Sequence, residues 1–549
     1  MNSIFRKKNL IYFLVLLAVI TGFIIIDEYG IGIEEHFQRK SGFFWLNFLF
    51  NFTELEFLKN QILEKINEIK QFTPNLYPIE KVPYYGVIFD LPLALVETLL
   101  KIDEPIDYFL LRHKITFLFF LLSAYLFYKI ILLRFKSTYL ALFGFLIFIF
   151  SPRIFGNIFF DNKDILFLSF LTINFFYFQK YYENKSIRNL ILVSLICSIS
   201  TSTRIIGILL PISFIILLLL QYLSDNNNKE SLKNFVIFLS FYFFFLLIHW
   251  PYLWTLSLSD WLNFFTPFFQ AMNPTVYFDG QFYQSKFLPI SYLPTWIILT
   301  TPIYILLFFI VGFYKNLKRL LFRFVSIDSK KNIFKFDLWR SNHEKFDLLV
   351  FINLFLIILL YISVKLALLS GWRHFYFVNF FIIYYSCFSV YLVMFFLKNK
   401  NILKKVFLFL LILFLSIQIY DIFKYHPFQS SYFNNFVSDE KKLKFEIDTQ
   451  SLSRVHAIKE IMKIDKDLIN LGTASWTPLE DARSMIPRKS WKKLNFVGTN
   501  FDNADYIYSN HYYEVNYQIN NKYQIPKNFS LYKTFLIDGT RIYSIYKKN

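Results

Sequence analysis

One short stretch of the chain, SPRIFGNIFFDNKD at residues 151–164, concentrates four charged side chains: Arg153, Asp161, Lys163 and Asp164. Apolar runs flank it on both sides, at 140–150 and 165–178. Charged groups are costly beside lipid and are kept there mainly for function. Arginine and lysine can hold an anion, and a carboxylate can take a proton from a hydroxyl group. The stretch therefore predicts a site for an ionic substrate at a membrane face. The alternative is a short loop whose charges are only solvated.

The composition predicts a membrane protein. Of the 549 residues, 55% are hydrophobic, and there are 73 Phe and 37 Tyr. The apolar residues form repeated blocks near the length that spans a bilayer, about 20 residues. The net charge of +19 could suggest nucleic acid, but the basic residues cluster in short loops between these blocks, as topology signals do. We therefore expect the lipid bilayer as a partner and no nucleic acid. Residues 421–549 contain no cysteine, so no disulfide framework is expected there.

The blocks predict an all-α polytopic bundle of about eleven transmembrane helices. The expected spans lie near 9–26, 107–133, 138–150, 165–180, between Arg188 and Thr201, and near 205–222, 234–249, 291–313, 347–368, 375–397 and 402–420. Basic residues precede the first span, and residues 315–345 hold nine Lys or Arg against three Asp or Glu. By the positive-inside rule this loop and the N-terminus are cytoplasmic, and residues 421–549 lie on the other side.

Three segments are expected outside the bundle on the extracytoplasmic face. The first, 27–106, contains an amphipathic helix that follows a capping-box pattern at Thr53–Glu56. The second is the aromatic-rich loop 250–290. The third, 421–549, mixes β-rich runs at 468–471, 505–508 and 540–546 with a helical stretch at 452–464 and predicts a small α/β domain. We therefore divide the chain into a transmembrane domain, 1–420, and an extracytoplasmic domain, 421–549.

With this topology, further ionisable residues fall at the outer ends of other spans. They are Asp27, Glu28, His36, Arg204, Arg373 and His374. Glu34 and Glu35 follow the first span as well. Such a face suits a reaction whose donor is an anionic lipid, because the cations would hold a phosphate while a carboxylate takes the proton of an incoming hydroxyl. A phosphate leaves already ionised, so stabilising its charge matters more than protonating it. Each residue alone could instead be a helix-end anchor or an ion-pair partner.

The chain resembles bacterial glycosyltransferase family 39 proteins, which are related to the protein O-mannosyltransferases. The stretch at 151–164 looks like the second outer-loop signature of that family. The other matching motifs, in chain order, are Asp27-Glu28 with His36, Tyr85-Gly86, Leu111-Arg112-His113, Gly371 to Phe377, His426-Pro427 with Tyr432-Phe-Asn434, and Phe445 to Asp448. The resemblance covers nearly the whole chain in order.

The resemblance implies a GT-C fold and transfer of a sugar from a polyprenyl-phosphate donor, generally with inversion at the anomeric carbon. It assigns Asp27 as the catalytic base, Glu28 as the second acid of that pair, and Asp164 as the second-loop acid. The residues expected to bind substrate are Arg153, Arg204 and Arg373 at the donor phosphate, supported by Lys163 and His374, together with His36 and Asp161. The resemblance also implies a bacterial inner membrane, with residues 421–549 in the periplasm.

The sequence departs from the family pattern at two places. Asn162 stands where proline is expected before Lys-Asp, and Thr449-Gln450-Ser451 replaces an aromatic-Trp-Gly motif. The acidic residues could hold Mg²⁺ or Mn²⁺ through oxygen ligands, although no compact ligand motif is present. The sequence leaves the sugar open, and the acceptor could be a lipid, a glycan or a protein.

Two other functions remain open at this point. A transporter or flippase for a lipid-linked sugar would also place charges in a cavity, usually with internal repeats or broken helices at mid-membrane. Here the charges collect at one face and no repeat is found. A non-catalytic scaffold that displays the C-terminal domain is the third possibility, but it gives no reason for carboxylates and arginines to converge.

Overall fold

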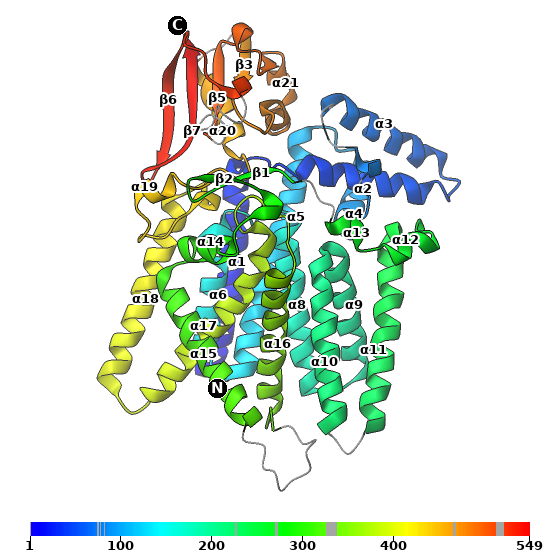
Figure 1. Ribbon diagram of the computed structural model, residues 1–549, viewed down its shortest axis with the longest axis vertical. Helices are drawn as coiled ribbons and strands as arrows, with labels where there is room; N and C mark the ends of the chain where they lie inside the picture. The colour runs from blue at the N-terminus through cyan, green and yellow to red at the C-terminus, as the bar shows by residue number, and fades with distance from the viewer. Residues whose placement is uncertain are drawn as a thin grey trace.

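The computed structural model describes residues 2–73, 76, 78–81, 83–224, 228–269, 273–325, 337–464, 468–511 and 521–549. Most of the chain is helical, as expected. Figure 1 shows a bundle of long helices with a small sheet-containing domain at one end, while the N-terminus lies at the other end. We call the end of the bundle that carries this domain the domain face, and the other end the opposite face.

Seven described helices are long and apolar enough to cross a membrane. These spans are Asn9–Glu28, Pro105–Phe135, Ile205–Leu223, Lys229–His249, Asn342–Ser363, Arg373–Phe396 and Asn401–Lys424. The corresponding helices are α1 (Asn2–Ile25), α5 (Pro105–Phe135), α10 (Leu209–Ser224), α11 (Asn228–His249), α16 (Asn342–Ser363), α17 (Asn379–Phe396) and α18 (Asn401–Lys424). The chain is therefore a multi-pass helical membrane protein.

The four remaining predicted blocks also form bundle helices. They are α6 (Thr138–Ile149), α8 (Asp164–Glu183), α9 (Ile187–Thr203) and α15 (Ile303–Val325), which follows the short α14 (Tyr292–Thr300). Of the basic loop 315–345, residues 326–336 lie outside the described residues.

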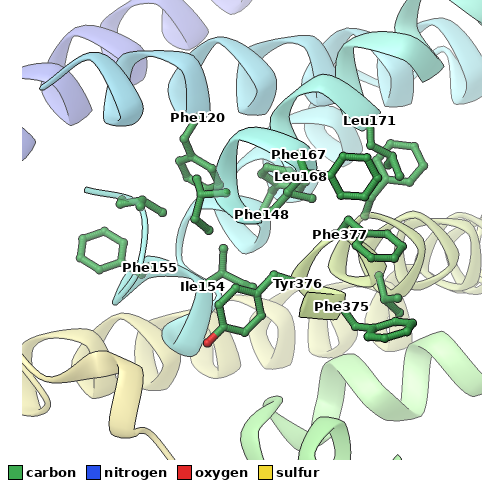
Figure 2. Close-up of a cluster of buried hydrophobic side chains, with 14 of the residues drawn as sticks. Phe120, Phe148, Ile154, Phe155, Phe167, Leu168, Leu171, Phe375, Tyr376 and Phe377 are labelled. Atoms are coloured by element: carbon green, nitrogen blue, oxygen red, sulfur yellow. The ribbon is translucent and has the colours of Figure 1, made fainter. Parts of the chain in front are cut away.

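Aromatic side chains fill the interior of the bundle. Phe175 of α8 stacks on Phe380 of α17 at 4.5 Å between ring centroids, and Phe127 of α5 stacks on Phe148 of α6 at 4.8 Å. Figure 2 shows part of this core, where Phe167, Leu168 and Phe377 lie close together. Large, flat side chains bury much apolar area per residue, so an interior rich in Phe can be packed tightly with few glycines.

The first outer segment forms a helical layer on the domain face. It contains α2 (Glu35–Phe50), α3 (Glu56–Phe72) and α4 (Asp90–Leu99). The amphipathic helix predicted here is α3, but the predicted capping box does not form, because the Thr53 hydroxyl donates to the carbonyl of Phe50 at 2.9 Å. The guanidinium of Arg39 donates to Glu97, with both side chains buried, and this ion pair connects α2 to α4.

The second outer segment and the connections between spans are short elements. They are α7 (Pro152–Phe155), α12 (Leu258–Leu262), α13 (Thr266–Phe269) and a hairpin of β1 (Thr275–Phe278) with β2 (Gln281–Gln284). Asp279 and Gly280 both have positive φ at the hairpin turn, which is the conformation of a tight two-residue connection. A short 3₁₀ segment, η6 (Arg373–Val378), leads into α17.

The C-terminal domain is a five-stranded mixed sheet with helices. Its strands are β3 (Ile469–Thr473), β4 (Leu494–Gly498), β5 (Tyr506–Ser509), β6 (Phe529–Ile537) and β7 (Thr540–Lys548), in the order β4-β3-β5-β7-β6. Its helices are α19 (Asp439–Lys442), α20 (Ser453–Ile464) and α21 (Arg488–Trp491). The three predicted β-rich runs form β3, β5 and β7, and the predicted helical stretch forms α20. The strands β4 and β6 were not predicted from the sequence.

Candidate active site

The stretch 151–164 folds as the short helix α7, a turn and the start of α8. Gly156 allows α7 to contact the segment after α18, because a Cβ at Gly156 would lie only 2.1 Å from the amide nitrogen of Ser430. At the other end, a carboxylate oxygen of Asp161 accepts hydrogen bonds from the amide of Asp164 at 3.0 Å and of Lys163 at 3.4 Å. Asp161 thus satisfies free N–H groups at the N-terminus of α8, and Asp164 becomes the first residue of that helix.

Charged side chains from four elements meet at this point. Arg204, at the end of α9, pairs with Asp164, and Arg373, at the start of η6, pairs with Glu34, which directly precedes α2. Asp164 and Arg373 are buried. We call Glu34, Asp161, Lys163, Asp164, Arg204 and Arg373 the charged cluster. The structure therefore brings together five of the predicted site residues. It adds Glu34, which was not predicted from the sequence as a site residue.

Two further residues border the charged cluster. The ammonium of Lys163 lies 3.0 Å from the centre of the Tyr85 ring. Tyr85 is held there by the next residue, since the amide of Gly86 donates to the carbonyl of Ser202 at 3.0 Å, close to Arg204 in the chain. His374 directly follows Arg373 in the chain, and its imidazole lies near Glu34.

Three loop residues of the charged cluster, Glu34, Asp161 and Lys163, have strongly shifted pKa values. Burial raises the pKa of Glu34, but the positive charges of Arg373, Lys163 and Arg204 outweigh this and hold it well below its usual range. Burial and the neighbouring Asp164 raise the pKa of Asp161 to about 8. Burial and the charge of Arg204 lower the pKa of Lys163 to about 7. At neutral pH, Glu34 is therefore ionised and Asp161 carries a proton.

Several buried polar atoms of the charged cluster have no hydrogen-bond partner among the described residues. They are the second carboxylate oxygens of Asp161 and Asp164 and the Nε atoms of Arg204 and Arg373. Buried polar atoms are nearly always satisfied, and leaving one unsatisfied costs about 1–3 kcal/mol. The arrangement thus offers free donors and acceptors to a polar ligand, with guanidinium groups suited to a phosphate.

Arg153 lies apart from these ion pairs. Its guanidinium is buried, stacks over Trp296 at 4.6 Å and over Phe433 at 5.6 Å, and leaves Nε and Nη2 without partners among the described residues. Gly371, with φ of +67°, lets the loop before Arg373 pass close to the Arg153 side chain, because a Cβ on Gly371 would lie 2.9 Å from Arg153 Nη1. Arg153 is thus a buried cation that lies against two aromatic rings.

Asp27 and Glu28 do not join the charged cluster. They form the exposed turn after α1, where Glu28 pairs with His426 at 2.7 Å, and the charges of both carboxylates act on Lys459 of the C-terminal domain. Within the described residues, no hydrogen bond or ion pair connects either of them to the charged cluster. The structure does not test the catalytic role that the resemblance suggests for them.

His36 also faces away from the charged cluster. Its Nε2 lies 3.0 Å from the carbonyl of Asp481 in the C-terminal domain, and its ring packs edge-on against Phe109 at 4.9 Å. Burial lowers the pKa of His36. His36 therefore connects the first outer segment to the C-terminal domain. Its binding to substrate stays a prediction.

Two of the stretches that carry the resemblance hold the first outer segment in place. Arg112 donates to Asp90 at 2.9 Å, and Asn162, which replaces the expected proline, donates to the same carboxylate oxygen at 3.4 Å. His113 contacts Glu35 at 2.9 Å. A proline at position 162 has no side-chain amide and could not donate this hydrogen bond to Asp90. This gives a local reason for the departure from the pattern.

A pocket lies above the loop that leads to Arg373. It contains about 860 Å³ of empty space, including its open mouth, between the β1–β2 hairpin, the loop at Leu369 and Ser370, and the C-terminal domain. Trp476, Asn510 and Arg541 line its domain side. Among the described residues, no group of three or more His, Cys, Asp or Glu side chains is placed to hold a metal ion.

Comparison with known proteins gives few matches. No protein-family model matches the sequence, and no curated protein matches it. Two solved structures of ArnT from Cupriavidus metallidurans align over nearly the full length of both chains. The apo structure has a TM-score of 0.47 and 10% identity, and covers 99% of this chain and 98% of its own. The structure bound to undecaprenyl phosphate has a TM-score of 0.43 and 11% identity, and covers 98% and 97%. Because both TM-scores are below 0.5, we base no conclusion on these alignments.

Proposed function

We propose that this protein is a membrane glycosyltransferase that moves a sugar from a polyprenyl-phosphate donor to an acceptor hydroxyl, with inversion at the anomeric carbon. The observation that carries the proposal is the charged cluster, where two carboxylates each pair with an arginine at the domain face. We infer that this face is extracytoplasmic, because the described parts of the Lys- and Arg-rich loop, 315–325 and 337–345, lie at the opposite face (Figure 1). In a bacterium the chain would lie in the inner membrane with its C-terminal domain in the periplasm.

The donor phosphate would enter the charged cluster beside Lys163, Arg204 and Arg373. The two arginines have donor atoms without partners among the described residues, and guanidinium groups bind phosphate oxygens in a fixed, often two-pronged geometry. Arg153, stacked on Trp296, is a further cation for the phosphate or the sugar ring. Stabilising the leaving phosphate lowers the barrier most, since its charge develops in the transition state.

In the proposed reaction, the acceptor oxygen attacks the anomeric carbon while the bond from that carbon to the phosphate oxygen breaks. The bonding electrons leave with polyprenyl phosphate, and a carboxylate of the enzyme takes the acceptor proton. We propose Glu34 for this role, because it is ionised and only half-buried, with an exposed fraction of 36%. When the donor phosphate draws Arg373 away from Glu34, the pKa of Glu34 rises and its carboxylate becomes a stronger base. Asp164, which pairs with Arg204 in the same way, is the second candidate.

The acceptor would reach this site from the pocket under the C-terminal domain. The pocket wall at Leu369 and Ser370 lies three to four residues before Arg373. An exposed indole, as at Trp476, is a common platform for a sugar ring, because one face is apolar and the N–H is polar. We therefore propose a hydroxyl-bearing acceptor that is itself glycosylated.

The test is sugar transfer by the purified full chain in lipid nanodiscs. A panel of radiolabelled polyprenyl-phosphate sugars would be supplied together with a membrane extract that contains acceptors. Transfer by the wild type and its loss in Glu34→Gln, with donor binding retained, would support the proposal. Donor binding without transfer, also with added divalent metal and varied acceptors, would reject it in favour of a flippase, which sealed vesicles with a lipid-linked sugar would then reveal.

A further inference from the structure

A second cavity lies at the opposite face, far along the bundle from the charged cluster. Residues of α5, α15, α16 and α17 and the turn before α16 line it, and it contains about 890 Å³ of empty space, including its open side. Basic side chains line one half: Arg134, Lys315 and Arg319, with His343 beside them. We call this cavity the basic pocket.

The carboxylates at the basic pocket are already committed to arginines. Asp347 receives a two-pronged pair of hydrogen bonds from Arg134, at 2.7 and 2.6 Å, and a third from Arg319 at 2.8 Å. Glu344 receives two from Arg323, at 2.5 and 2.9 Å. The hydroxyl of Tyr384 also donates to Asp347 at 2.5 Å. Asp347 is buried, and its oxygens have little capacity left for a further cation.

Positive charge remains after these pairs are formed. Arg134, Arg319 and Lys315 line the basic pocket against a single carboxylate, Glu344, and within the described residues Lys315 takes part in no ion pair. The Nε atom of Arg319 is buried and likewise has no partner among them. Lys315 is exposed, so its ammonium can pair with an anion at the membrane surface. The basic pocket is therefore built for an anion.

The other half of the basic pocket is apolar. Phe388, Tyr391, Leu392 and Phe396 of α17 line it, and Phe396 is 69% exposed on the outer surface of the helix. A soluble anion would gain nothing from this wall. An anionic phospholipid could place its phosphate among the arginines and its acyl chains along the aromatic side chains, as lipids do in basic pockets between transmembrane helices.

We propose that the basic pocket binds a phosphate group, supplied by the headgroup of an anionic phospholipid of the surrounding leaflet. The bound phosphate compensates the excess charge of Lys315 and Arg319 and fastens the ends of α15 and α17 to the membrane. The proposal does not depend on sugar transfer, since the charged cluster lies at the domain face.

The test is native mass spectrometry of the purified full chain with added phosphatidylglycerol or phosphatidylcholine. Wild type should retain phosphatidylglycerol and not phosphatidylcholine. Lys315→Gln and Arg319→Gln should each retain about fivefold less phosphatidylglycerol, the effect expected for one cation near an anionic headgroup. Lys315→Gln leaves every ion pair of the basic pocket intact, so it stays informative if Arg319→Gln fails to fold. Lys318→Gln is the matched control, because Lys318 is on α15, is exposed and does not line the basic pocket.

Inorganic phosphate distinguishes the two sources of the anion. Displacement of phosphatidylglycerol only by large excesses of inorganic phosphate, together with weaker retention by Phe396→Ser, would support the lipid headgroup. Calorimetric binding of inorganic phosphate that is lost in Lys315→Gln, without lipid preference, would assign the pocket to soluble phosphate and overturn the lipid source. Equal retention of both phospholipids, or equal losses in Lys315→Gln and Lys318→Gln, would overturn the proposal.

Discussion

Glu34 and Glu35 are neighbours in the sequence but have different surroundings. Glu35 is buried, contacts His113 and accepts a hydrogen bond from the amide of Gly32 at 2.8 Å, so it fixes the start of α2. Glu34 is half-exposed and pairs with Arg373 at the charged cluster. At the residue scale, the orientation of a side chain decides which of two identical carboxylates can meet a substrate.

Replacing Glu34 by glutamine removes the proposed base and keeps the shape of the side chain. We expect kcat for sugar transfer to fall about 10²- to 10⁴-fold, the usual contribution of a positioned general base, while donor binding is retained. Transfer of labelled sugar and a donor-binding titration measure the two effects separately. Asp27→Asn is the control, and we expect it to keep most of the activity because Asp27 is exposed and away from the charged cluster. The opposite result for these two variants would return the role of base to Asp27.

Donor affinity should depend on pH through Lys163 and Asp161. Lys163, with a pKa of about 7, is charged below that pH and neutral above it. Asp161, with a pKa of about 8, is neutral below that pH and negative above it. Both changes weaken phosphate binding as pH rises, so Kd for the donor should increase between pH 6 and pH 9, by up to about tenfold per unit for each group.

Lys163→Arg separates these two contributions, because arginine stays charged throughout this range. In this variant the contribution of Lys163 should disappear, so Kd should rise less steeply with pH than in the wild type, and only the contribution of Asp161 should remain. A donor titration at half-unit steps of pH would measure both. An unchanged profile in Lys163→Arg would show that Lys163 does not contact the phosphate.

At the scale of elements, α15 and α17 approach each other closely at Gly312. A Cβ at this glycine would lie 2.0 Å from the carbonyl oxygen of Tyr385, a backbone atom that cannot move aside. Small residues permit such close helix contacts in membrane proteins. The contact holds α17, whose preceding segment η6 carries Arg373, at a fixed distance from the rest of the bundle.

Gly312→Ala should therefore destabilise the protein. Forcing one extra carbon into a packed contact costs about 1–3 kcal/mol, so we expect a lower thermal unfolding midpoint in detergent. Val311→Ala, at the neighbouring exposed position, is the control and should change the midpoint little. Equal midpoints for both variants would mean that the two helices can separate without loss of stability.

At the scale of the whole molecule, the C-terminal domain holds the first outer loop in place. Arg454 of α20 is buried, and its guanidinium donates to the carbonyl of Pro478 at 2.7 Å and of Ile31 at 3.2 Å. Gly30 lies against the carbonyl of Leu452, where a Cβ would be only 2.5 Å away. The loop that carries Glu34 is thus fastened to a domain more than 400 residues later in the chain.

Arg454→Met should loosen this loop without touching the substrate. A misplacement of about 1 Å can cost about 100-fold in rate, so we expect kcat to fall by up to that factor while Kd for the donor stays within about twofold. Lys489→Met, at an exposed position of the same domain, is the control. Parallel loss of activity and of donor binding in Arg454→Met would indicate that the domain does not fold, and circular dichroism would detect this.

The sequence alone determined the class of the protein and most of its helices. Apolar blocks of spanning length can satisfy their backbone in lipid only as helices, so composition and block length predict the bundle directly. The grouping of Asp161, Lys163 and Asp164 with Arg204 and Arg373 also followed, because charges at the same ends of spans share one membrane face. The sequence did not indicate β4 and β6, since strand pairing depends on distant partners more than on local preference.

Only the tertiary structure decided which first-loop carboxylate meets the arginines. Asp27, Glu28, Glu34 and Glu35 all follow the first span, and spacing does not distinguish them. The turn after α1 directs Asp27 and Glu28 to solvent and the C-terminal domain, while the contacts of Gly30 and Ile31 bring Glu34 to Arg373. The physical reason is that an outer loop has no period that fixes its direction, so its path is set by the surfaces that pack against it.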